Sequence, residues 1–195
     1  TTGPNELSPG SDVANLAVMG YNPLQCYTGR SPLEAASIGV KLDAKDITFR
    51  CNLVTLSDER DYANKTMVDY SSDEISTEDA HILMKAIAEE LDTDILKFYG
   101  GTSYRHLLVY QNGSVNCILT PPHDISDRKI GDYLPKGENS EVLLAIMKRS
   151  HDILKNHPLN KKRIQKGLHP ANSLWIWGQG SRPELENFNQ KFGLK

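Results

Sequence analysis

The sequence lacks the features that mark secreted, membrane-spanning and disulfide-stapled proteins. No apolar run approaches the roughly 18 to 20 residues that a membrane-spanning helix needs, and no charged-then-apolar signal segment opens the chain. The three cysteines, Cys26, Cys51 and Cys117, are odd in number and far apart without CxxC spacing, which argues against a disulfide framework and a zinc knuckle. We therefore expect a cytoplasmic protein with reduced cysteines and no membrane partner.

Several signatures of ligand sites are missing as well. There is no Walker-type glycine loop and no dinucleotide fingerprint, and no His or Asp pair has the spacing of metal ligands. What is present is ordinary globular composition, with 195 residues of which 38% are hydrophobic and 24% charged. The opening Thr-Thr-Gly-Pro and the glycine- and proline-rich first thirty residues are typical of the interior of a larger protein. We expect an excised piece.

The net charge of -3 is unevenly distributed. Residues 58–92 carry eleven acids against three basic residues, whereas residues 148–166 carry seven basic residues against one acid. The basic stretch is typical of a solvated helix face, and the alternative is an attractive field for an anionic small molecule or a partner domain. It contains no aromatic residue for base stacking, so we expect no nucleic-acid partner.

Hydrophobic periodicity predicts the secondary structure. Apolar residues at helical spacing indicate helices at 77–91 and 140–156, and a Ser-Pro start with Ser31 as the cap indicates a short helix at 31–38. A brief helix is expected after Ser11. Predicted strands cover 47–56, 65–70, 95–99, 104–111, 115–119 and 173–177, with those from 95 to 119 forming a meander. This order predicts an α+β fold, a mainly antiparallel sheet with helices packed on one face.

The sharpest local signal is Ser11, which follows a glycine at the start of a predicted helix. Its hydroxyl would lie near unpaired backbone N–H groups, a position that suits a nucleophile and equally suits an ordinary N-cap. Arg30 precedes the next helix, where its guanidinium and the helix terminus could hold one anion. Arg50 lies inside an apolar strand, so it must reach an edge or line a polar pocket.

Two further segments carry candidate groups. Arg105 and His106 begin a strand, and because neighbouring strand residues point to opposite faces they cannot serve one pocket without a bend. His123 and Asp124 follow two prolines, which places an imidazole and a possible orienting carboxylate on a rigid loop. For each histidine a structural hydrogen-bonding role remains the alternative to catalysis.

Segments along nearly the whole chain resemble one family. They are 9–16 (PGSDVANL), 49–52 (FRCN), 103–106 (SYRH), 122–125 (PHDI) and 170–180 (PANSLWIWGQG). In the same order they are similar to segments of the cofactor-independent phosphoglycerate mutases of the archaeal type, in the alkaline phosphatase superfamily. The resemblance implies that residues 41–172 form an inserted substrate-binding domain, flanked by a catalytic-domain segment with the nucleophile motif at 1–40 and a return segment at 173–195.

The resemblance also implies a chemistry. Ser11 matches the serine that carries the phosphoryl group and binds two divalent metals, manganese, magnesium or zinc. The other metal ligands are expected outside this chain, so the piece alone should hold no metal and be inactive. The residues expected to bind the small phosphorylated carboxylate are Arg30, Arg50, Arg105, His106, His123 and Asp124.

One segment departs from the family pattern. Residues 66–72 (TMVDYSS) lack the paired arginines that many archaeal members carry there. We expect the parent protein to interconvert 3- and 2-phosphoglycerate. Two other functions remain as alternatives. One is a homoserine kinase-like phosphotransferase of the same family, and the other is a non-catalytic binding or assembly module that contacts the remainder of the catalytic domain.

Overall fold

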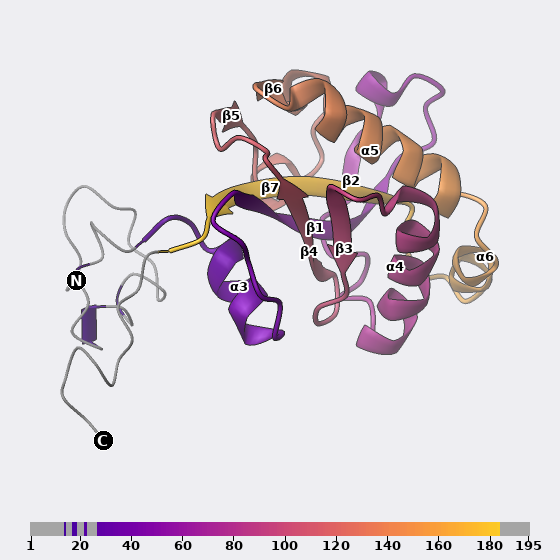
Figure 1. The fold of residues 1–195 in the computed structure, drawn as a ribbon. Coiled ribbons are helices and arrows are strands. Elements are labelled where there is room, and N and C mark those ends of the chain that lie inside the picture. The colour runs from indigo at the N-terminus through magenta and orange to yellow at the C-terminus, as the bar shows by residue number, and fades with distance from the viewer. Residues whose placement is uncertain (1–13, 15–16, 19–21, 23–26, 184–195) are drawn as a thin grey trace.

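The computed structural model describes residues 14, 17–18, 22 and 27–183 (Figure 1). The named elements, in chain order, are α3 (Ser31–Ser37), β1 (Asp46–Leu56), η1 (Tyr62–Asn64), β2 (Met67–Asp69), α4 (Thr77–Leu91), β3 (Leu96–Tyr99), β4 (Arg105–Gln111), β5 (Cys117–Ile118), η2 (Pro122–Ile125), η3 (Gly131–Tyr133), β6 (Lys136–Gly137), α5 (Ser140–Leu154), α6 (Pro158–Gln165) and β7 (Ser173–Ser181). The η elements are single 3-10 turns. The fold is α+β, as predicted.

The main sheet is built around β1, which is buried along its whole length. β4 pairs antiparallel with β1 on one side, with Cys51 opposite His106, and β3 continues the sheet beyond β4. β7 pairs antiparallel along the other side, with Arg50 opposite Trp177, and the short β2 pairs with the last residues of β1. A strand enclosed in this way has two buried faces, and its alternating residues serve different environments.

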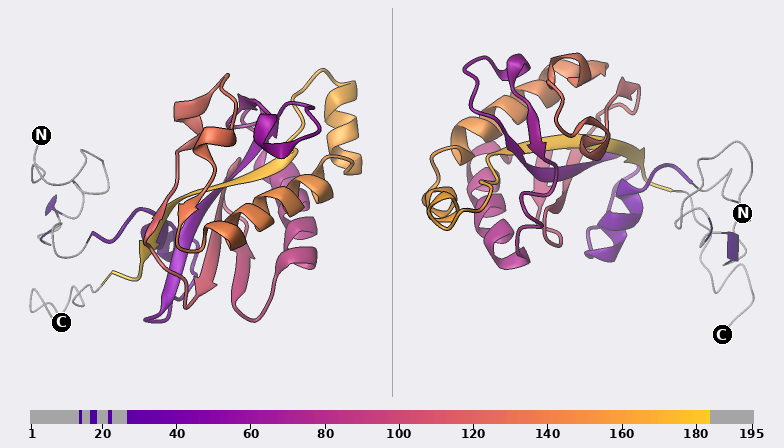
Figure 2. Two further views of the ribbon diagram at one scale, coloured as in Figure 1. Left: turned by 90° about the horizontal axis from the view of Figure 1, so that it is seen from above. Right: turned by 180° about the vertical axis from the view of Figure 1, so that it is seen from behind.

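One face of the sheet is apolar and is covered by α4 and α5 (Figure 2). Phe49, Cys51 and Leu53 of β1 point into this core, where they meet the apolar stripes of the two helices. The N-terminus of α4 is capped by Ser76, whose hydroxyl accepts the N–H of Asp79 at 3.1 Å. Cap and stripe together explain why α4 spans the predicted residues without deviation.

The opposite face of the sheet is polar near β1 and is covered in part by α3. A small separate apolar cluster joins Ala35 of α3 to Leu107 and Val109 of β4. The two long helices thus share one face, as expected, while α3 lies against the other. This second face carries Thr48, Arg50 and Asn52, the residues of β1 that alternate with the apolar ones.

The start of α3 differs from the prediction. Ser31 is not the N-cap, because Arg30 occupies that position and no side-chain oxygen caps the helix. The hydroxyl of Ser31 is buried and donates instead to the carbonyl of Thr48 at 3.1 Å. The serine therefore ties α3 to β1.

The second half of the chain differs from the prediction in three places. The predicted third strand of the meander does not join β4, because β1 and β3 already occupy both edges of β4; β5 pairs with β6 instead. The sequence analysis did not predict α6, which begins at Pro158 after the end of α5, with Pro in the first turn and the His157 ring accepting the N–H of Leu159 at 3.2 Å. β7 also continues to Ser181, past its predicted end.

The chain enters and leaves the described domain at one place (Figure 1). The hydroxyl of Thr28 donates to the carbonyl of Ser181, and two glycines allow the two segments to touch. A Cβ at Gly29, whose φ is +127°, would lie 2.7 Å from the carbonyl oxygen of Gln179, and a Cβ at Gly180 would lie 2.7 Å from the carbonyl oxygen of Thr28. Entry and exit segments are thus packed side by side.

Two predictions concern residues outside the described ones, Ser11 and Cys26. Of the brief helix expected after Ser11, the structure describes residues 14, 17 and 18, which are helical. Within the described residues, no helix is long and apolar enough to cross a membrane.

Candidate functional site

The polar face of the sheet is organised around Arg50. This side chain is only 7% exposed, although it carries a permanent charge. Its Nε donates to Glu34 Oε2 of α3 at 3.0 Å, and its guanidinium carbon lies 4.1 Å from the ring centroid of Trp177. One ion pair and one stacked indole therefore fix the orientation of the buried guanidinium.

Trp177 is itself held in place. Its Nε1–H donates to Oδ1 of Asn52 at 2.9 Å, and the Nδ2 of Asn52 donates to the carbonyl of Tyr70 at 3.2 Å. Gly178 follows the tryptophan with a φ of +61°, and a Cβ there would lie 3.0 Å from Cδ of Arg50. The register between β7 and β1 shifts at this point, between Thr48 and Arg50.

Aromatic rings continue from Trp177 across this face. The His123 ring lies 5.4 Å from the Trp177 ring and 6.2 Å from the Tyr70 ring, in both cases edge-on. Tyr70 in turn meets Tyr104 edge-on at 6.0 Å, and the guanidinium of Arg105 lies 5.2 Å from the Tyr104 ring. We call this row from Arg50 to Arg105 the arginine–aromatic cluster.

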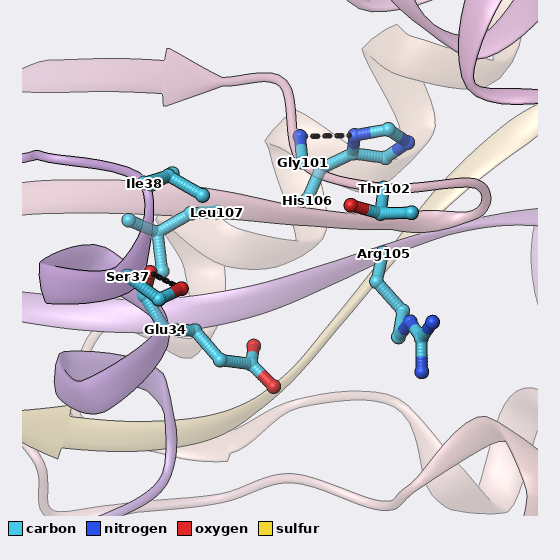
Figure 3. Close-up of a pocket in the computed structure, with 8 residues that line it drawn as sticks. All are labelled: Glu34, Ser37, Ile38, Gly101, Thr102, Arg105, His106 and Leu107. Carbon is cyan, nitrogen blue, oxygen red and sulfur yellow. Dashed lines mark hydrogen bonds between the residues drawn. The ribbon is translucent and has the colours of Figure 1, made fainter.

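Next to the cluster is a cavity of about 160 Å³ between α3 and the turn that joins β3 to β4. Glu34 and Ser37 line it from α3, and Gly101, Thr102 and Arg105 line it from the sheet. Figure 3 shows the Glu34 and Arg105 side chains extending to the same side of the strands. Arg105 forms no ion pair with any carboxylate of the described residues, so its guanidinium is open to a ligand.

The cluster carries positive charge that Glu34 partly neutralises. Nε of Arg30 lies 3.4 Å from Oε1 of Glu34, and Arg50 pairs with the other oxygen of the same carboxylate. Burial lowers the pKa of the Arg50 guanidinium, and the charges of Arg30 and Arg105 act in the same direction while Glu34 opposes them. Arg30 and Arg50 therefore share one carboxylate, and Arg105 has none within ion-pair distance among the described residues, which favours an incoming anion.

His123 and Asp124 lie in η2 at the edge of the cluster. Nε2 of His123 is 3.7 Å from Oδ1 of Asp124, and both side chains are at least half exposed. The loop thus presents an imidazole and a carboxylate to solvent beside Trp177, as the two prolines suggested.

His106 is among the residues that line the cavity, but its ring is buried and lies on the opposite side of β4 from the Arg105 side chain, as Figure 3 shows. Nδ1 accepts the N–H of Gly101 at 3.1 Å, and Nε2 has no hydrogen-bond partner within the described part of the chain. Burial lowers the pKa of His106 to about 3, with the charge of His81 adding to the shift. The ring is a neutral core residue.

The structure thus gathers the side chains of five of the six predicted substrate-side residues, Arg30, Arg50, Arg105, His123 and Asp124, and turns the ring of the sixth, His106, to the other side of β4. Sequence reasoning did not single out Glu34, Asn52, Tyr70, Tyr104 or Trp177 for this site. One signal was available: Thr48, Arg50 and Asn52 alternate with Phe49, Cys51 and Leu53, which marks one face of β1 as polar.

One group of potential metal ligands occurs in the described ranges. Asp69, Asp73 and His169 have ligand atoms within 4.8 Å of one another, and His169 Nδ1 lies 3.0 Å from Asp73 Oδ1. Three donors on one patch are too few for two metal ions. The described residues therefore do not fit a two-metal centre, and Ser11 lies outside them.

The described part is an α+β domain with an arginine–aromatic cluster beside a cavity, and comparison with known proteins gives its family. The family model for 2,3-bisphosphoglycerate-independent phosphoglycerate mutase matches residues 1–160. The chain belongs to this family.

Curated relatives support the assignment. A probable 2,3-bisphosphoglycerate-independent phosphoglycerate mutase of Geobacter sulfurreducens is 49% identical over 193 residues, which are 99% of this chain and 48% of the relative. The mutase of Methanosarcina acetivorans is 45% identical over 98% of this chain and 47% of its own length. The chain thus spans about half the length of the curated relatives it matches.

Solved structures agree with the fold. The cofactor-independent phosphoglycerate mutase of Thermoplasma acidophilum aligns with a TM-score of 0.68 and 26% identity, covering 92% of this chain and 49% of that one. The PH0037 protein of Pyrococcus horikoshii aligns with a TM-score of 0.69 over 96% of this chain and 42% of that one, and its 23% identity supports the fold alone.

Proposed function

We propose that this chain supplies the substrate-binding domain of a cofactor-independent phosphoglycerate mutase, and that the arginine–aromatic cluster binds the phosphorylated carboxylate. The observation that carries the proposal is the convergence of three arginines, from the N-cap of α3, from β1 and from β4, on one face of the sheet. The guanidinium group of arginine binds phosphate and carboxylate groups through paired hydrogen bonds. A substrate that carries both groups therefore suits a site with several arginines.

Each residue of the cluster has a separate part in the proposal. Arg50, held by Glu34 and stacked on Trp177, presents a pre-oriented fork whose position costs little entropy on binding. Arg105, which has no acidic partner, binds the second anionic group. His123 with Asp124 lies where an imidazole can donate to or accept from a substrate hydroxyl.

The metal chemistry of the proposal belongs to the whole enzyme. Two divalent metal ions would stabilise charge on a phosphoryl group in transfer to Ser11. Because the described residues do not fit a two-metal centre, we place the remaining ligands outside this sequence and derive no step through the metals. On this proposal the 195-residue chain alone is inactive.

The contact between entry and exit segments supports an inserted domain. Thr28 and Ser181 are hydrogen-bonded, and Gly29 and Gly180 let their backbones approach closely. A domain whose two connections lie together can be inserted into another domain without disturbing its fold. We infer that the catalytic domain joins this one at that end.

The test uses the full-length parent with manganese and 3-phosphoglycerate, without added bisphosphoglycerate. The wild type is expected to form 2-phosphoglycerate, Ser11→Ala to lose all turnover, and Arg50→Lys to lose roughly tenfold or more in kcat/KM. The exposed Arg149→Lys is the matched control and should keep wild-type kinetics. Normal turnover by Ser11→Ala would contradict the phosphoserine mechanism.

The homoserine kinase-like alternative has one observation in its favour. In place of the paired arginines common at 66–72, Tyr70 presents a neutral ring to His123 and Tyr104. Such a site carries less positive charge for a doubly anionic substrate. ATP-dependent phosphorylation of homoserine, without mutase activity, would select this alternative.

A further inference from the structure

A second hollow lies on the other side of the sheet from the arginine–aromatic cluster. It measures about 470 Å³, is open to solvent, and is lined by the loop that follows β1, by η1 and by α5. That volume is within the range of small-molecule sites. Since α5 packs on the apolar face, the hollow is separate from the site described above.

A buried ammonium group lies in this hollow. Lys65 is 4% exposed, and its Nζ donates one hydrogen bond, to the carbonyl of Ser57 at 3.0 Å. An ammonium group has three N–H donors. No carboxylate in the described ranges lies within ion-pair distance of it, so two donors remain for a ligand or water in the hollow. Burying a charge without a counter-ion is costly, which favours an anion there.

Two further cations line the hollow without an acidic partner among the residues described. They are Lys148 of α5 and Arg60 of the loop after β1. A fourth cation, Lys155, is already engaged, because its Nζ lies 2.6 Å from Oδ1 of Asp152. N–H donors without an acidic partner in the described part of the chain therefore come both from α5 and from the loop after β1.

Acidic side chains also line the hollow, and most of them already accept a hydrogen bond or pair with a lysine. Asp61 accepts the N–H of Ala63 at 3.1 Å, and Glu59 accepts the hydroxyl of Ser57. Asp152 holds Lys155. Asp58 at the rim is the remaining carboxylate. These carboxylates keep their charge and further lone pairs, so the case for an anion rests on the cations that no carboxylate pairs in the described ranges, Lys65, Lys148 and Arg60.

His151 adds an acceptor to the hollow. Its Nδ1 lies 2.8 Å from the carbonyl of Asn172, and because a carbonyl can only accept, Nδ1 carries the proton. Burial, reinforced by the charge of Lys65, lowers the pKa of His151. The ring is then neutral near pH 7, and Nε2 presents a lone pair to a hydroxyl group.

We propose that this hollow, formed by Lys65, Lys148, Arg60 and His151, binds the phosphate group of a small metabolite at a site distinct from the arginine–aromatic cluster. The cations bind the phosphate oxygens, and His151 Nε2 accepts a hydrogen bond from a hydroxyl of the same molecule. The ligand class is therefore a hydroxylated phosphate monoester, with free phosphate as the simpler source of the same group. A ligand here would bridge α5 and the loop after β1.

The test titrates the 195-residue chain with inorganic phosphate and, separately, with glycerol 1-phosphate, and follows the His151 ring signals by NMR. Saturable shifts are expected in both titrations, with the hydroxylated ester binding more tightly. Lys148→Ala should weaken binding about five- to tenfold, and Lys65→Met should weaken it more. The control is Lys161→Ala on α6, outside the hollow, which should bind as the wild type does.

Two results would overturn the proposal. One is the absence of a saturable His151 shift in millimolar phosphate, and the other is an equal loss of affinity in Lys148→Ala and Lys161→Ala. If Lys65→Met does not fold, the Lys148 comparison decides alone. Repeating the titration in Arg50→Lys keeps the two sites distinguishable, because the His151 shifts should persist when the cluster is impaired.

Discussion

The two faces of β1 differ in what their buried residues contact. On one face Phe49, Cys51 and Leu53 meet only the apolar core beneath α4 and α5. On the other face Thr48, Arg50 and Asn52 are as deeply buried but are each hydrogen-bonded to side chains or backbone of α3, β7 or the segment after β2. A single strand thus supplies stability on one side and a pre-oriented binding surface on the other.

The comparison teaches that burial alone does not identify the core. Apolar burial contributes in proportion to the area removed from water, about 25 cal/mol per Å², and needs no particular partner. Buried polar groups contribute only when each is matched, and they fix orientation instead. We therefore expect substitutions on the apolar face to change stability, and those on the polar face to change binding.

The largest expected effect is on the apolar face. Phe49→Ala removes a fully buried ring and should lower the free energy of unfolding by about 3–5 kcal/mol, as measured by denaturant titration. Ile176→Val, which removes one methylene from the same core, should cost about 1 kcal/mol. If Phe49→Ala is tolerated with no change in midpoint, the apolar face does not carry the stability.

A second expected effect concerns His106, also on the apolar face. Its pKa is about 3 in the fold against an ordinary 6.5, so the unfolded chain binds a proton that the native chain does not. Protonation of the unfolded chain therefore lowers the free energy of unfolding as the pH falls from 6.5 toward 3. The expected loss is about 2 kcal/mol between pH 7 and pH 5.

Denaturant midpoints at pH 7 and pH 5 measure this dependence. His106→Gln should lose about that much of the wild-type pH dependence. His123→Gln is the matched control because it retains His106 and should retain the dependence on it. The burial argument is wrong if both variants keep the same slope as the wild type.

A third, smaller effect is expected where the polar face is joined to α3. Glu34→Gln leaves the buried Arg50 without its counter-charge and should cost about 1–2 kcal/mol of stability, less than a fully buried pair because Glu34 is partly exposed. The exposed pair Lys85–Glu89 serves as the comparison, and Glu89→Gln should change stability by less than about 0.5 kcal/mol. Equal losses in the two variants would show that the pair with Arg50 has no special role.

The smallest expected change in stability is at the edge of the cluster. Arg105→Gln removes an exposed guanidinium without an acidic partner, so unfolding should stay within about 0.5 kcal/mol of the wild type. Binding of 3-phosphoglycerate, measured by calorimetry, should weaken about fivefold or more. Arg149→Gln, an exposed arginine on α5, should bind normally. Unchanged affinity in Arg105→Gln would remove this residue from the proposed site.

Local signals in the sequence were sufficient for much of the fold. The helix α4 was predicted from Thr77 to Leu91 because its cap and apolar stripe are adjacent in sequence. Strand alternation likewise predicted that Arg105 and His106 point to opposite faces, as they do. The pairing partner of β5 could not be predicted from local signals. It depends on β1, which lies more than forty residues earlier in the sequence and pairs with the edge of β4 that β5 would otherwise occupy.

The candidate site was only partly predictable for the same reason. Arg50 was singled out because a charge inside an apolar strand requires a partner, but that partner, Glu34, lies 16 positions earlier and Trp177 comes from the far end of the chain. The contact of Trp177 with Asn52 spans 125 positions. The hydrophobic periodicity of a segment gives no information about contacts between residues so far apart in sequence.

The chain's two tryptophans allow the most direct test of the central claim, which is that the polar face binds the phosphorylated carboxylate. The indole N–H of Trp177 lies in the cluster, whereas that of Trp175 is bonded to the carbonyl of Thr120 in the buried interior. In an NMR titration of the chain with 3-phosphoglycerate, the Trp177 indole signal should shift saturably while the Trp175 signal stays in place. A Trp177 signal that does not move at saturating ligand would contradict the account.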